Sequence, residues 1–352
     1  MISQTFMAFR ETFSLPRGGI SARAGGATAA LAVDPAPSGR HNPGMERLYF
    51  ILGCTACGKG TLGRELARRV GGQIVSVDSM KVYRRMDIGT AKPSPADRAA
   101  VPHHCIDLVE PSETFSAAQY VREADEAVAR IRAAGAVPLA VGGTSLYLMA
   151  LSEGLFEGPS ADAEVRESLR RRAAAEGLAA LHAELARVDP EAAGRIHPND
   201  EKRICRALEV HAATGRGISE LQTQWGAGPR RYDCVRIGLR RARDDQSGRI
   251  NLRVRRMIEL GLREEVDRLL AEPAGLSATA AAAVGYAEMI DHLAGRCSLN
   301  QAVERIKINT RRLAKKQRTW HRRWQDVRWF DVAPDETPQA LAERVLREVE
   351  MK

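Results

Sequence analysis

The 352-residue chain is poor in aromatic side chains and has no long apolar segment. Phe, Trp and Tyr make up 5% of the residues, and no run approaches the roughly eighteen apolar residues of a membrane-spanning helix. We therefore expect no association with a membrane. Hydrophobic residues at 44% and charged residues at 28% are ordinary for a folded soluble protein, and they exclude collagen-like and wholly disordered chains.

Cysteine is present but lacks the spacing of a disulfide or zinc framework. The six cysteines are scattered, and only Cys54 and Cys57 have the spacing typical of a metal-binding pair. No second pair accompanies them, so we favour free thiols in a reducing compartment over a zinc site. The expected location is therefore cytoplasmic.

Acidic residues are scarce in the first 44 residues, where Glu11 and Asp34 stand among Gly, Ala, Ser, Pro and Arg. This segment lacks the continuous apolar run of a secretory signal. We expect residues 1–45 to be a disordered leader or a misassigned start, with Met45 as the alternative first residue. An organelle-targeting peptide is a weaker alternative.

Positive charge, in contrast, is concentrated in two stretches. Residues 301–330 contain ten basic and two acidic side chains, and residues 230–256 contain ten arginines and three aspartates. The formal charge of the whole chain is +9, so the rest of it is mildly acidic. Such an asymmetry is typical of a protein that binds a polyanion. In residues 301–330, tryptophans alternate with arginines, which fits stacking on unpaired bases, an amphipathic helix with buried indoles, or both.

The order of the apolar runs predicts an α/β fold. A strand at 48–52 precedes a glycine-rich loop and a helix at 62–70. Further strands are expected at 74–77 and 137–141, the second of them after an amphipathic helix at 117–134. Strands that alternate with helices indicate a parallel sheet, and ligands of such sheets bind at the carboxyl ends of the strands. The loops after these three strands should therefore converge on one crevice.

The remaining chain is mostly helical in pattern, apart from a candidate strand at 232–239. We expect a phosphate-loop parallel sheet with a helical insertion and C-terminal helices. The predicted parts are a core at 46–159, a helical insertion at 160–232, a core return with a basic helical region at 233–330, and a C-terminal tail at 331–352.

Residues 53–59, GCTACGK, fit the phosphate-loop pattern, because they follow a strand and open a helix. In such a loop, backbone N–H groups and the helix N-terminus bind a di- or triphosphate, and Lys59 neutralises its outer charge. The Ser or Thr that normally follows the lysine and binds Mg²⁺ is Gly60 here, with Thr61 next. Either Thr61 takes over through a shifted register, or Mg²⁺ is held by phosphate, water and another side chain.

Asp78 and Thr144 stand after the other two strands. A carboxylate at Asp78 suits a water-mediated Mg²⁺ ligand or a general base, and its structural alternative is a turn or a helix cap. The glycine pair before Thr144 is a weak signal by itself. His103 and His104 suggest a metal site, but adjacent residues of an extended segment point to opposite sides, so we do not expect them to share an ion.

Six runs in this order resemble tRNA dimethylallyltransferases, the prenyltransferases that modify adenosine 37 beside the anticodon. They are residues 53–61, 78–93 (DSMKVYRRMDIGTAKP), 102–107 (PHHCID), 141–147 (VGGTSLY), 197–209 (HPNDEKRICRALE) and 310–320 (TRRLAKKQRTW). The resemblance implies that dimethylallyl diphosphate, and not a nucleoside triphosphate, places its diphosphate on the loop with Mg²⁺. The N6 amine of an adenine flipped from the anticodon loop would then attack the allylic carbon.

The resemblance also implies the site residues. Asp78 is the expected general base on N6, and it forms the catalytic site with Thr144. The expected diphosphate-binding residues are Gly53, Cys54, Thr55, Ala56, Cys57, Gly58, Lys59, Gly60, Thr61 and Arg253. The expected tRNA-binding residues are Asp78, Ser79, Met80, Lys81, Thr144, Arg166, Lys202, Arg203, Ile204, Cys205 and Arg206, to which the basic stretch at 301–330 adds Arg311 and Arg312. The expected partners are tRNA and dimethylallyl diphosphate, the expected cofactor is Mg²⁺, and the expected state is a monomer.

The chain departs from this family at several positions. Cys54 and Cys57 replace a proline and a small residue, which should not disturb a loop that acts through its backbone. Lys81 stands where the family usually has glutamine, so the exact RNA contact there is left open. A small-molecule or nucleotide kinase would explain the phosphate loop but neither basic stretch. A non-catalytic RNA-binding protein would explain the basic stretches but not the loop or Asp78.

Overall fold

The computed structural model of the protein describes residues 45–156, 158, 163–222 and 230–351. They divide into two compact units: a core unit from the ranges Pro35–Gly154 and Arg230–Lys352, and a helical unit from the range Leu155–Pro229. The leader predicted at 1–45 lies, except for Met45, outside the described residues. In the described ranges, no helix is long and apolar enough to cross a membrane.

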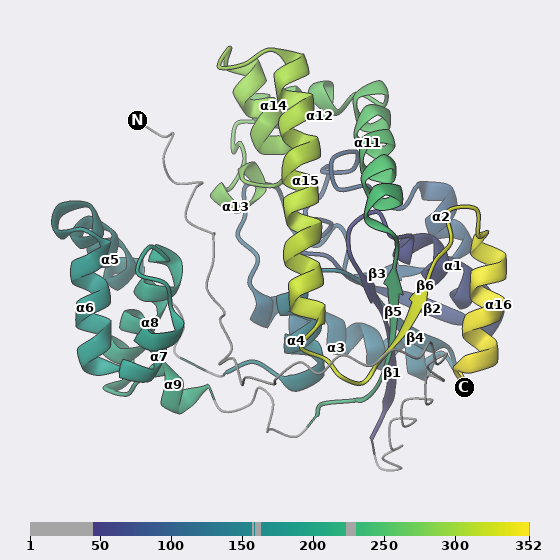
Figure 1. Ribbon diagram of the computed structural model, residues 1–352, viewed down its shortest axis with the longest axis horizontal. Helices are drawn as coiled ribbons and strands as arrows, with labels where there is room; N and C mark the ends of the chain where they lie inside the picture. The colour runs from purple at the N-terminus through teal and green to yellow at the C-terminus, as the bar shows by residue number, and fades with distance from the viewer. Residues whose placement is uncertain (1–44, 157, 159–162, 223–229, 352) are drawn as a thin grey trace, which may run out of the picture. The chain divides into compact units, whose positions relative to one another are not determined.

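The core unit is built on a six-stranded parallel sheet with the strand order β3-β2-β4-β1-β5-β6 (Figure 1). The strands are β1 (Arg47–Gly53), β2 (Gly72–Val77), β3 (His103–His104), β4 (Val137–Gly142), β5 (Asp233–Arg240) and β6 (Val327–Asp331). The inner strands read as nearly continuous apolar runs because both faces of the sheet are covered by helices.

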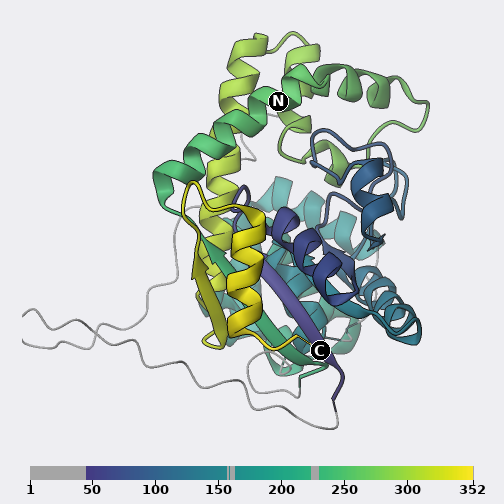
Figure 2. The same cartoon turned by 90° about the vertical axis from the view of Figure 1, so that its right-hand side faces the viewer.

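Four helices cover most of the two faces of the sheet (Figure 2). They are α1 (Lys59–Val70) and α16 (Pro338–Glu348) on one face, and α3 (Ala117–Ala133) and α4 (Ser145–Glu153) on the other. Successive strand residues point to opposite faces, so Ile51 packs with Leu66 of α1 while its neighbour Phe50 packs with Tyr120 of α3. Tyr120 stacks on Tyr147 of α4 with ring centroids 3.9 Å apart.

Further helices form a third apolar cluster with the segment that follows β2. They are α11 (Arg243–Glu259), α12 (Leu262–Ala271), α13 (Ala278–Ala281), α14 (Tyr286–Leu293) and α15 (Leu299–His321). Helix α15 has 23 residues and contacts α11 and α14 as well as α4 and β1. It therefore connects this helical cluster to the sheet. The short helix α2 (Pro95–Ala100) lies between β2 and β3 in sequence.

The helical unit has its own apolar core, which includes Leu181, Leu185 and Ile204, all fully buried. Its helices are α5 (Ala163–Glu176), α6 (Leu178–Val188), α7 (Pro190–Arg195), α8 (Glu201–Thr214) and α9 (Ile218–Leu221).

The predicted α/β class with a parallel sheet is confirmed, and the three strands expected at 48–52, 74–77 and 137–141 are β1, β2 and β4. The expectation of a tail at 331–352 is wrong. These residues contain α16, whose amphipathic pattern buries Leu341, Ala342 and Val345 against the sheet face that α1 also covers. Strand β6 also lies within a stretch that was expected to be helical after β5.

His321 ends α15 in a buried aromatic cluster. Its side chain is 1% exposed, and its ring stacks with Trp324 at a centroid distance of 6.0 Å. Neither ring nitrogen has a hydrogen-bond partner in the described structure. Burial, with a smaller contribution from Lys59, lowers the pKa of His321 from 6.5 to about 4. The folded protein therefore favours the neutral ring.

We expect His321 to make the core unit less stable in mild acid. Between pH 6.5 and about 4 the unfolded chain binds a proton that the folded chain does not, so the free energy of unfolding should fall by about 3 kcal/mol as the pH decreases. The substitution His321→Phe should remove this part of the pH dependence. Urea unfolding followed by tryptophan fluorescence at several pH values measures it, with His197→Asn as the control. An identical pH slope in wild type and His321→Phe would contradict the assignment.

Candidate active site

The ends of β1, β2 and β4 form the site, because these strands are neighbours in the sheet and all run in the same direction. The phosphate loop follows β1, Asp78 follows β2, and Thr144 follows β4. The predicted convergence of the three loops on one edge of the sheet is thus confirmed. Gly142 is required at this edge, since a Cβ there would lie 2.0 Å from the carbonyl oxygen of Val77.

The phosphate loop opens α1 with a helix start that has no side-chain cap. Gly58 is the N-cap residue, with φ 102, a left-handed conformation that favours glycine. The first N–H groups of a helix have no partner within the helix, and the helix dipole adds positive potential at this end. An anion can therefore take the place of the missing cap.

The loop carbonyls of residues 54–57 all accept hydrogen bonds from side chains. Lys59 binds the carbonyl of Cys54 at 2.8 Å. The other three donors lie on α11 or just before it: Gln246 Nε2 to Thr55 O at 2.8 Å, Arg249 Nε to Ala56 O at 3.3 Å, and Arg241 Nε to Cys57 O at 3.1 Å. In a trans peptide the carbonyl and the following N–H point in opposite directions. Of the N–H groups that follow these carbonyls, Thr55 donates to Gln317 and Cys57 donates to the Cys54 carbonyl at 3.3 Å, so within the described contacts those of Ala56 and Gly58 are left for an anion.

Gln317 of α15 joins this loop to the turn after β4. Its Oε1 accepts the Thr55 N–H at 2.7 Å, and its Nε2 donates to the Gly143 carbonyl at 2.9 Å. The next residue, Arg318, donates to Gln246 Oε1 at 2.6 Å and so orients the amide that holds the Thr55 carbonyl. Both polar groups of the Thr55 backbone are thus fixed by side chains from α11 and α15.

The carboxylate and the hydroxyl of the site are held by short local contacts. Asp78 is half-buried, and its Oδ1 accepts the Met80 N–H at 3.0 Å. Thr144 Oγ1 accepts the Ser79 N–H at 3.0 Å. No other hydrogen bond to Asp78 exists in the described part of the chain, so Oδ2 is left for a substrate proton. The turn-former interpretation of Asp78 and the catalytic one are compatible.

Lys81 interacts electrostatically with Asp78 and with three further cations, Lys59, Arg64 and Arg253. Burial lowers the pKa of Lys81 to about 8; Asp78 opposes this shift, while Arg253, Lys59 and Arg64 add to it. Burial also lowers the pKa of Arg253, with Asp78 again acting in the opposite direction. The site therefore has an excess of positive charge, which suits a ligand with several negative charges.

The segment between Asp78 and Pro93 is anchored by buried acids and a buried lysine. Glu265 of α12 accepts the N–H groups of Asp87, Ile88 and Gly89 at 3.0, 2.8 and 3.2 Å, and it accepts the Tyr286 hydroxyl at 2.6 Å. Gly89 is needed here, because a Cβ would lie 2.4 Å from the Tyr286 ring.

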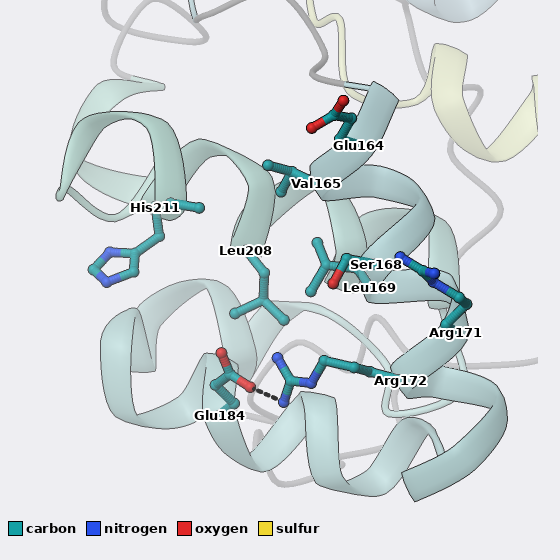
Figure 3. Close-up of a pocket in the computed structure, with 10 residues that line it drawn as sticks. Glu164, Val165, Ser168, Leu169, Arg171, Arg172, Glu184, Leu208 and His211 are labelled. Carbon is teal, nitrogen blue, oxygen red and sulfur yellow. Dashed lines mark hydrogen bonds and ion pairs between the residues drawn. The ribbon is translucent and has the colours of Figure 1, made fainter.

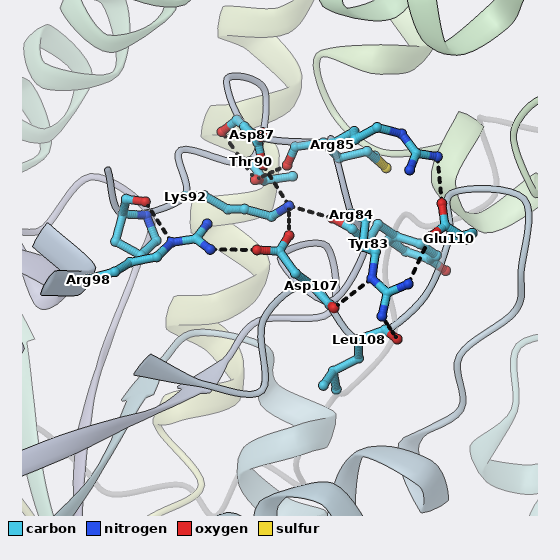
Figure 4. A network of polar contacts seen from close by, with 12 residues as sticks. Tyr83, Arg84, Arg85, Asp87, Thr90, Lys92, Arg98, Asp107, Leu108 and Glu110 are labelled. Carbon is cyan, nitrogen blue, oxygen red and sulfur yellow. Dashed lines mark hydrogen bonds and ion pairs between the residues drawn. The ribbon is translucent and has the colours of Figure 1, made fainter. Parts of the chain in front are cut away.

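Lys92 is the centre of the neighbouring network (Figure 4). Its side chain is 1% exposed, and its Nζ lies 2.7 Å from Asp87 and 2.6 Å from Asp107. Asp107 also pairs with Arg98 at 2.6 Å. These residues of the runs 78–93 and 102–107 shape the loop that begins at Asp78, and they have a structural role.

The two histidines before Asp107 face different partners. His103 Nδ1 lies 2.7 Å from the Val101 carbonyl, and His104 Nε2 lies 2.8 Å from Gln73 Oε1.

Cys54 and Cys57 are free thiols that belong to different apolar clusters. Throughout the described ranges, no group of three or more His, Cys, Asp or Glu side chains is arranged to hold a metal ion.

The donors for a protein-bound Mg²⁺ are few. Gly60 offers no hydroxyl, Thr61 is exposed to solvent on the next helical position, and the neighbours of Asp78 are cations. Mg²⁺ prefers an octahedral set of oxygen ligands, most of them water or phosphate. This donor set does not fit a metal ion held by the protein itself.

The predicted tRNA-binding residues of the helical unit differ in accessibility. Lys202 and Arg203 are exposed, whereas Arg166 forms a two-pronged pair with Glu209 at 2.6 and 3.0 Å. Ile204 and Cys205 are 0% and 6% exposed in the core of the unit. The prediction that these two side chains contact tRNA is therefore wrong, because the helix turns them inward. Arg206 also lies near Glu209, at 3.4 Å.

A hollow of about 480 Å³ also lies within the helical unit (Figure 3). It is lined by α5, α6 and α8 and contains the ion pair of Arg172 and Glu184, 2.6 Å apart. Its walls carry charges of both signs, so it does not have the positive character of the phosphate-loop site.

The two basic stretches have different roles in the structure. Five arginines of the first one pair with aspartates at 2.5 to 3.0 Å: Arg230 and Arg236 with Asp326, Arg231 with Asp125, Arg240 with Asp331, and Arg241 with Asp245. Part of the charge in 230–256 is thus compensated, and the expectation that this stretch binds a polyanion stays a prediction.

Helix α15 carries the exposed cations of the second stretch. Arg312, Lys315 and Arg322 are exposed at helical spacing, so they lie on one face. Arg311 instead donates to Asn251 of α11 and ties the two helices together. Trp324 is half-buried, and its indole N–H donates to Glu153 at 3.1 Å. We call Arg312, Lys315 and Arg322 the α15 basic face.

The fold and the site define an α/β protein in which a glycine-rich loop and an uncapped helix N-terminus follow one strand of a parallel sheet and a carboxylate follows a nearby strand. A family model described as IPP transferase matches residues 81–324. The tRNA dimethylallyltransferase of Geobacter sulfurreducens is 48% identical over 285 residues, which cover 81% of this chain and 92% of that protein. The enzyme of the same name from Anaeromyxobacter dehalogenans is 47% identical, with coverage of 85% and 99%.

Two solved structures agree with these relatives. The tRNA isopentenylpyrophosphate transferase of Bacillus halodurans is 38% identical with a TM-score of 0.62, covering 86% of this chain and 96% of that one. A eukaryotic dimethylallyltransferase acting on tRNA is 25% identical with a TM-score of 0.74, covering 86% and 78%. The chain therefore belongs to the tRNA dimethylallyltransferases, a family of prenyltransferase enzymes.

Proposed function

We propose that the protein transfers the dimethylallyl group of dimethylallyl diphosphate to N6 of adenosine 37 in tRNA. The observation that carries this proposal is the position of the phosphate loop beside Asp78 in a chain of this family. One substrate is an allylic diphosphate and the other is an RNA, and both are anions. A kinase that binds ATP on the same loop finds no support in the sequence relatives or in the structural neighbours.

The phosphate loop is the proposed site of the diphosphate. The N–H groups at the start of α1, together with Lys59 and Arg253, face the region where the leaving diphosphate gains negative charge. Donors that are already oriented stabilise that charge without reorganisation, which lowers the barrier to breaking the bond between the allylic carbon and oxygen.

Asp78 is the proposed general base. The exocyclic amine of adenine is a weak nucleophile, so removal of its proton as the new C–N bond forms assists the attack. The electron pair of N6 forms the bond to the allylic carbon, the carbon–oxygen pair leaves with pyrophosphate, and the N6 proton passes to Asp78 Oδ2. Thr144 and residues 79–81 are the proposed contacts to the flipped nucleotide, whose extrusion costs a few kcal/mol.

The direct test is an assay with radiolabelled dimethylallyl diphosphate, Mg²⁺ and unmodified tRNA. We expect the label in the RNA on N6 of adenosine 37, and no phosphate transfer from ATP to small acceptors in parallel reactions. The substitution Asp78→Asn keeps the shape of the side chain but removes the base, so turnover should fall by about 10²-fold or more while tRNA affinity stays unchanged. The matched control is Asp267→Asn, on an exposed aspartate of α12.

Two outcomes would contradict the proposal at different points. Label-free RNA together with ATP-dependent phosphorylation of a small acceptor would refute prenyl transfer. Unchanged turnover of Asp78→Asn would leave prenyl transfer in place but remove Asp78 as the base.

The α15 basic face is the proposed contact to the phosphates of tRNA. Removal of Arg312 and Lys315 by Arg312→Ala combined with Lys315→Ala should weaken tRNA binding. The slope of log affinity against log salt should become shallower by about 0.7 to 0.9 for each lost contact. Filter binding over a range of salt concentrations measures the slope. The control combines Arg263→Ala with Arg268→Ala on the exposed side of α12. A slope equal to that of wild type would mean that this face is only solvated.

Three further expectations complete the proposal. Mg²⁺ is proposed to arrive with the diphosphate, bound by its oxygens and by water, because the described residues contain no cluster of acids, histidines or cysteines that could hold it. The protein is proposed to act as a monomer, and its proposed location is the cytoplasm. Arg166, Lys202, Arg203 and Arg206 remain proposed contacts to tRNA.

A further inference from the structure

Gly60 follows the phosphate-loop lysine, Lys59. In phosphate loops that hold Mg²⁺, a Ser or Thr at this position supplies the metal ligand. Gly60 supplies none, and the described residues contain no group of three or more His, Cys, Asp or Glu that could hold a metal ion. A protein cation at this position would therefore take over part of the charge balance that an anchored metal ion provides.

Arg64 occupies the space beside Gly60. It lies four residues later on α1, hence on the same face, and helical side chains lean towards the N-terminus of their helix. Its Nη1 is 3.6 Å from the position that a Cβ would take on Gly60. The guanidinium group thus ends where the side chain of a Ser or Thr would begin.

The arginine is held in this orientation by an acid from another helix. Arg64 Nε lies 3.1 Å from Asp97 Oδ1, and the Arg64 side chain is 25% exposed. Asp97 is itself fixed, since it forms a capping box with Ser94 at the start of α2. The contact uses Nε and leaves the Nη groups, the part of the guanidinium that binds phosphate oxygens in pairs, for other acceptors.

We propose that Arg64 binds the diphosphate next to Lys59 and supplies the positive charge that a hydroxyl-anchored Mg²⁺ supplies in other phosphate loops. This inference rests on the proposed function, because it assigns a further residue to the same diphosphate site. Gly60 and Arg64 then form a pair, in which the glycine leaves the space and the arginine fills it. Binding of the diphosphate therefore depends less on Mg²⁺ than it does in phosphate loops that have a Ser or Thr at this position.

The test is the affinity of the full chain for inorganic pyrophosphate, measured by calorimetry once with EDTA and once with Mg²⁺. Wild type should bind in EDTA, and Mg²⁺ should change its affinity by less than Arg64→Ala does. Arg64→Ala should lose about tenfold or more in EDTA, as expected for a cation removed from an anion site. Arg64→Lys, which keeps a charge, should lose less. The control is Arg68→Ala, one turn further along α1 and 53% exposed.

A double variant restores the hydroxyl that follows the lysine in other phosphate loops and removes the arginine. A Cβ on Gly60 meets Arg64 only at ordinary contact distance, so Gly60→Thr can be accommodated. Gly60→Thr combined with Arg64→Ala should bind pyrophosphate weakly in EDTA and regain affinity when Mg²⁺ is added. Circular dichroism and thermal melting of each variant exclude loss of folding as the cause.

Two results would overturn the inference: no binding of pyrophosphate by wild type in EDTA, or equal affinities of wild type and Arg64→Ala there. Neither result affects the labelling of tRNA by wild type in Mg²⁺. Failure of this inference is thus distinguishable from failure of the proposed function.

Discussion

The site depends on the way two glutamines fix one residue of the phosphate loop, Thr55, through the peptide groups on either side of it. Gln317 holds the Thr55 N–H and Gln246 holds its carbonyl, and they come from α15 and α11, which lie far from the loop in sequence. A glycine-rich loop has many backbone conformations of similar energy, and folding must restrict them. Here the restriction comes from side chains that bind the carbonyls and the Thr55 N–H, and the Cys57 N–H donates to the Cys54 carbonyl. Within the described contacts, this leaves the N–H groups of Ala56 and Gly58 for an anion. The same Gln317 also binds Gly143, next to Thr144, so the places proposed for the two substrates are linked through a single side chain.

The charged side chains of the crevice determine which ligands it suits. Lys81 interacts electrostatically with one carboxylate, Asp78, and with three further cations, Lys59, Arg64 and Arg253. Burial is the main cause of the lowered pKa of Lys81, and these cations add to it. A bound allylic diphosphate or RNA phosphate would stabilise the charged form of Lys81. Several arginines outside the crevice are paired with acids, as in the stretch 230–256, where Asp326, Asp125 and Asp331 from other parts of the chain compensate three of its seven net positive charges.

The sequence predicted the parts of this structure that depend on local pattern. Apolar periodicity and the ends of strands predict the three strands, the helix at 117–134, the phosphate loop and the positions of Asp78 and Thr144.

The sequence could not identify four residues of the site, because each acts through a contact that only the folded chain creates. They are Gln246, Arg249, Gln317 and Arg64. Gln317 stands inside a run that marks the family, yet nothing in the run shows that its amide reaches Thr55. For Ile204 and Cys205, the resemblance of the run 197–209 to the family predicted contacts to tRNA, whereas both side chains are buried in the core of the helical unit. Three of the four aspartates that pair with the arginines of 230–256 lie elsewhere in the chain, so counting charges along the sequence overstated the net charge of that stretch.

The central claim is that Gln317 shapes the diphosphate site through Thr55, and the affinity for inorganic pyrophosphate tests it most directly. Gln317→Met keeps the size of the side chain but neither of its hydrogen bonds, while Gln317→Glu keeps an acceptor for the Thr55 N–H. With melting temperatures equal to that of wild type, the account predicts a loss of about tenfold for Gln317→Met, since a lost buried hydrogen bond costs about 1 kcal/mol or more, and a smaller loss for Gln317→Glu. Pyrophosphate affinity of Gln317→Met equal to that of wild type would contradict it.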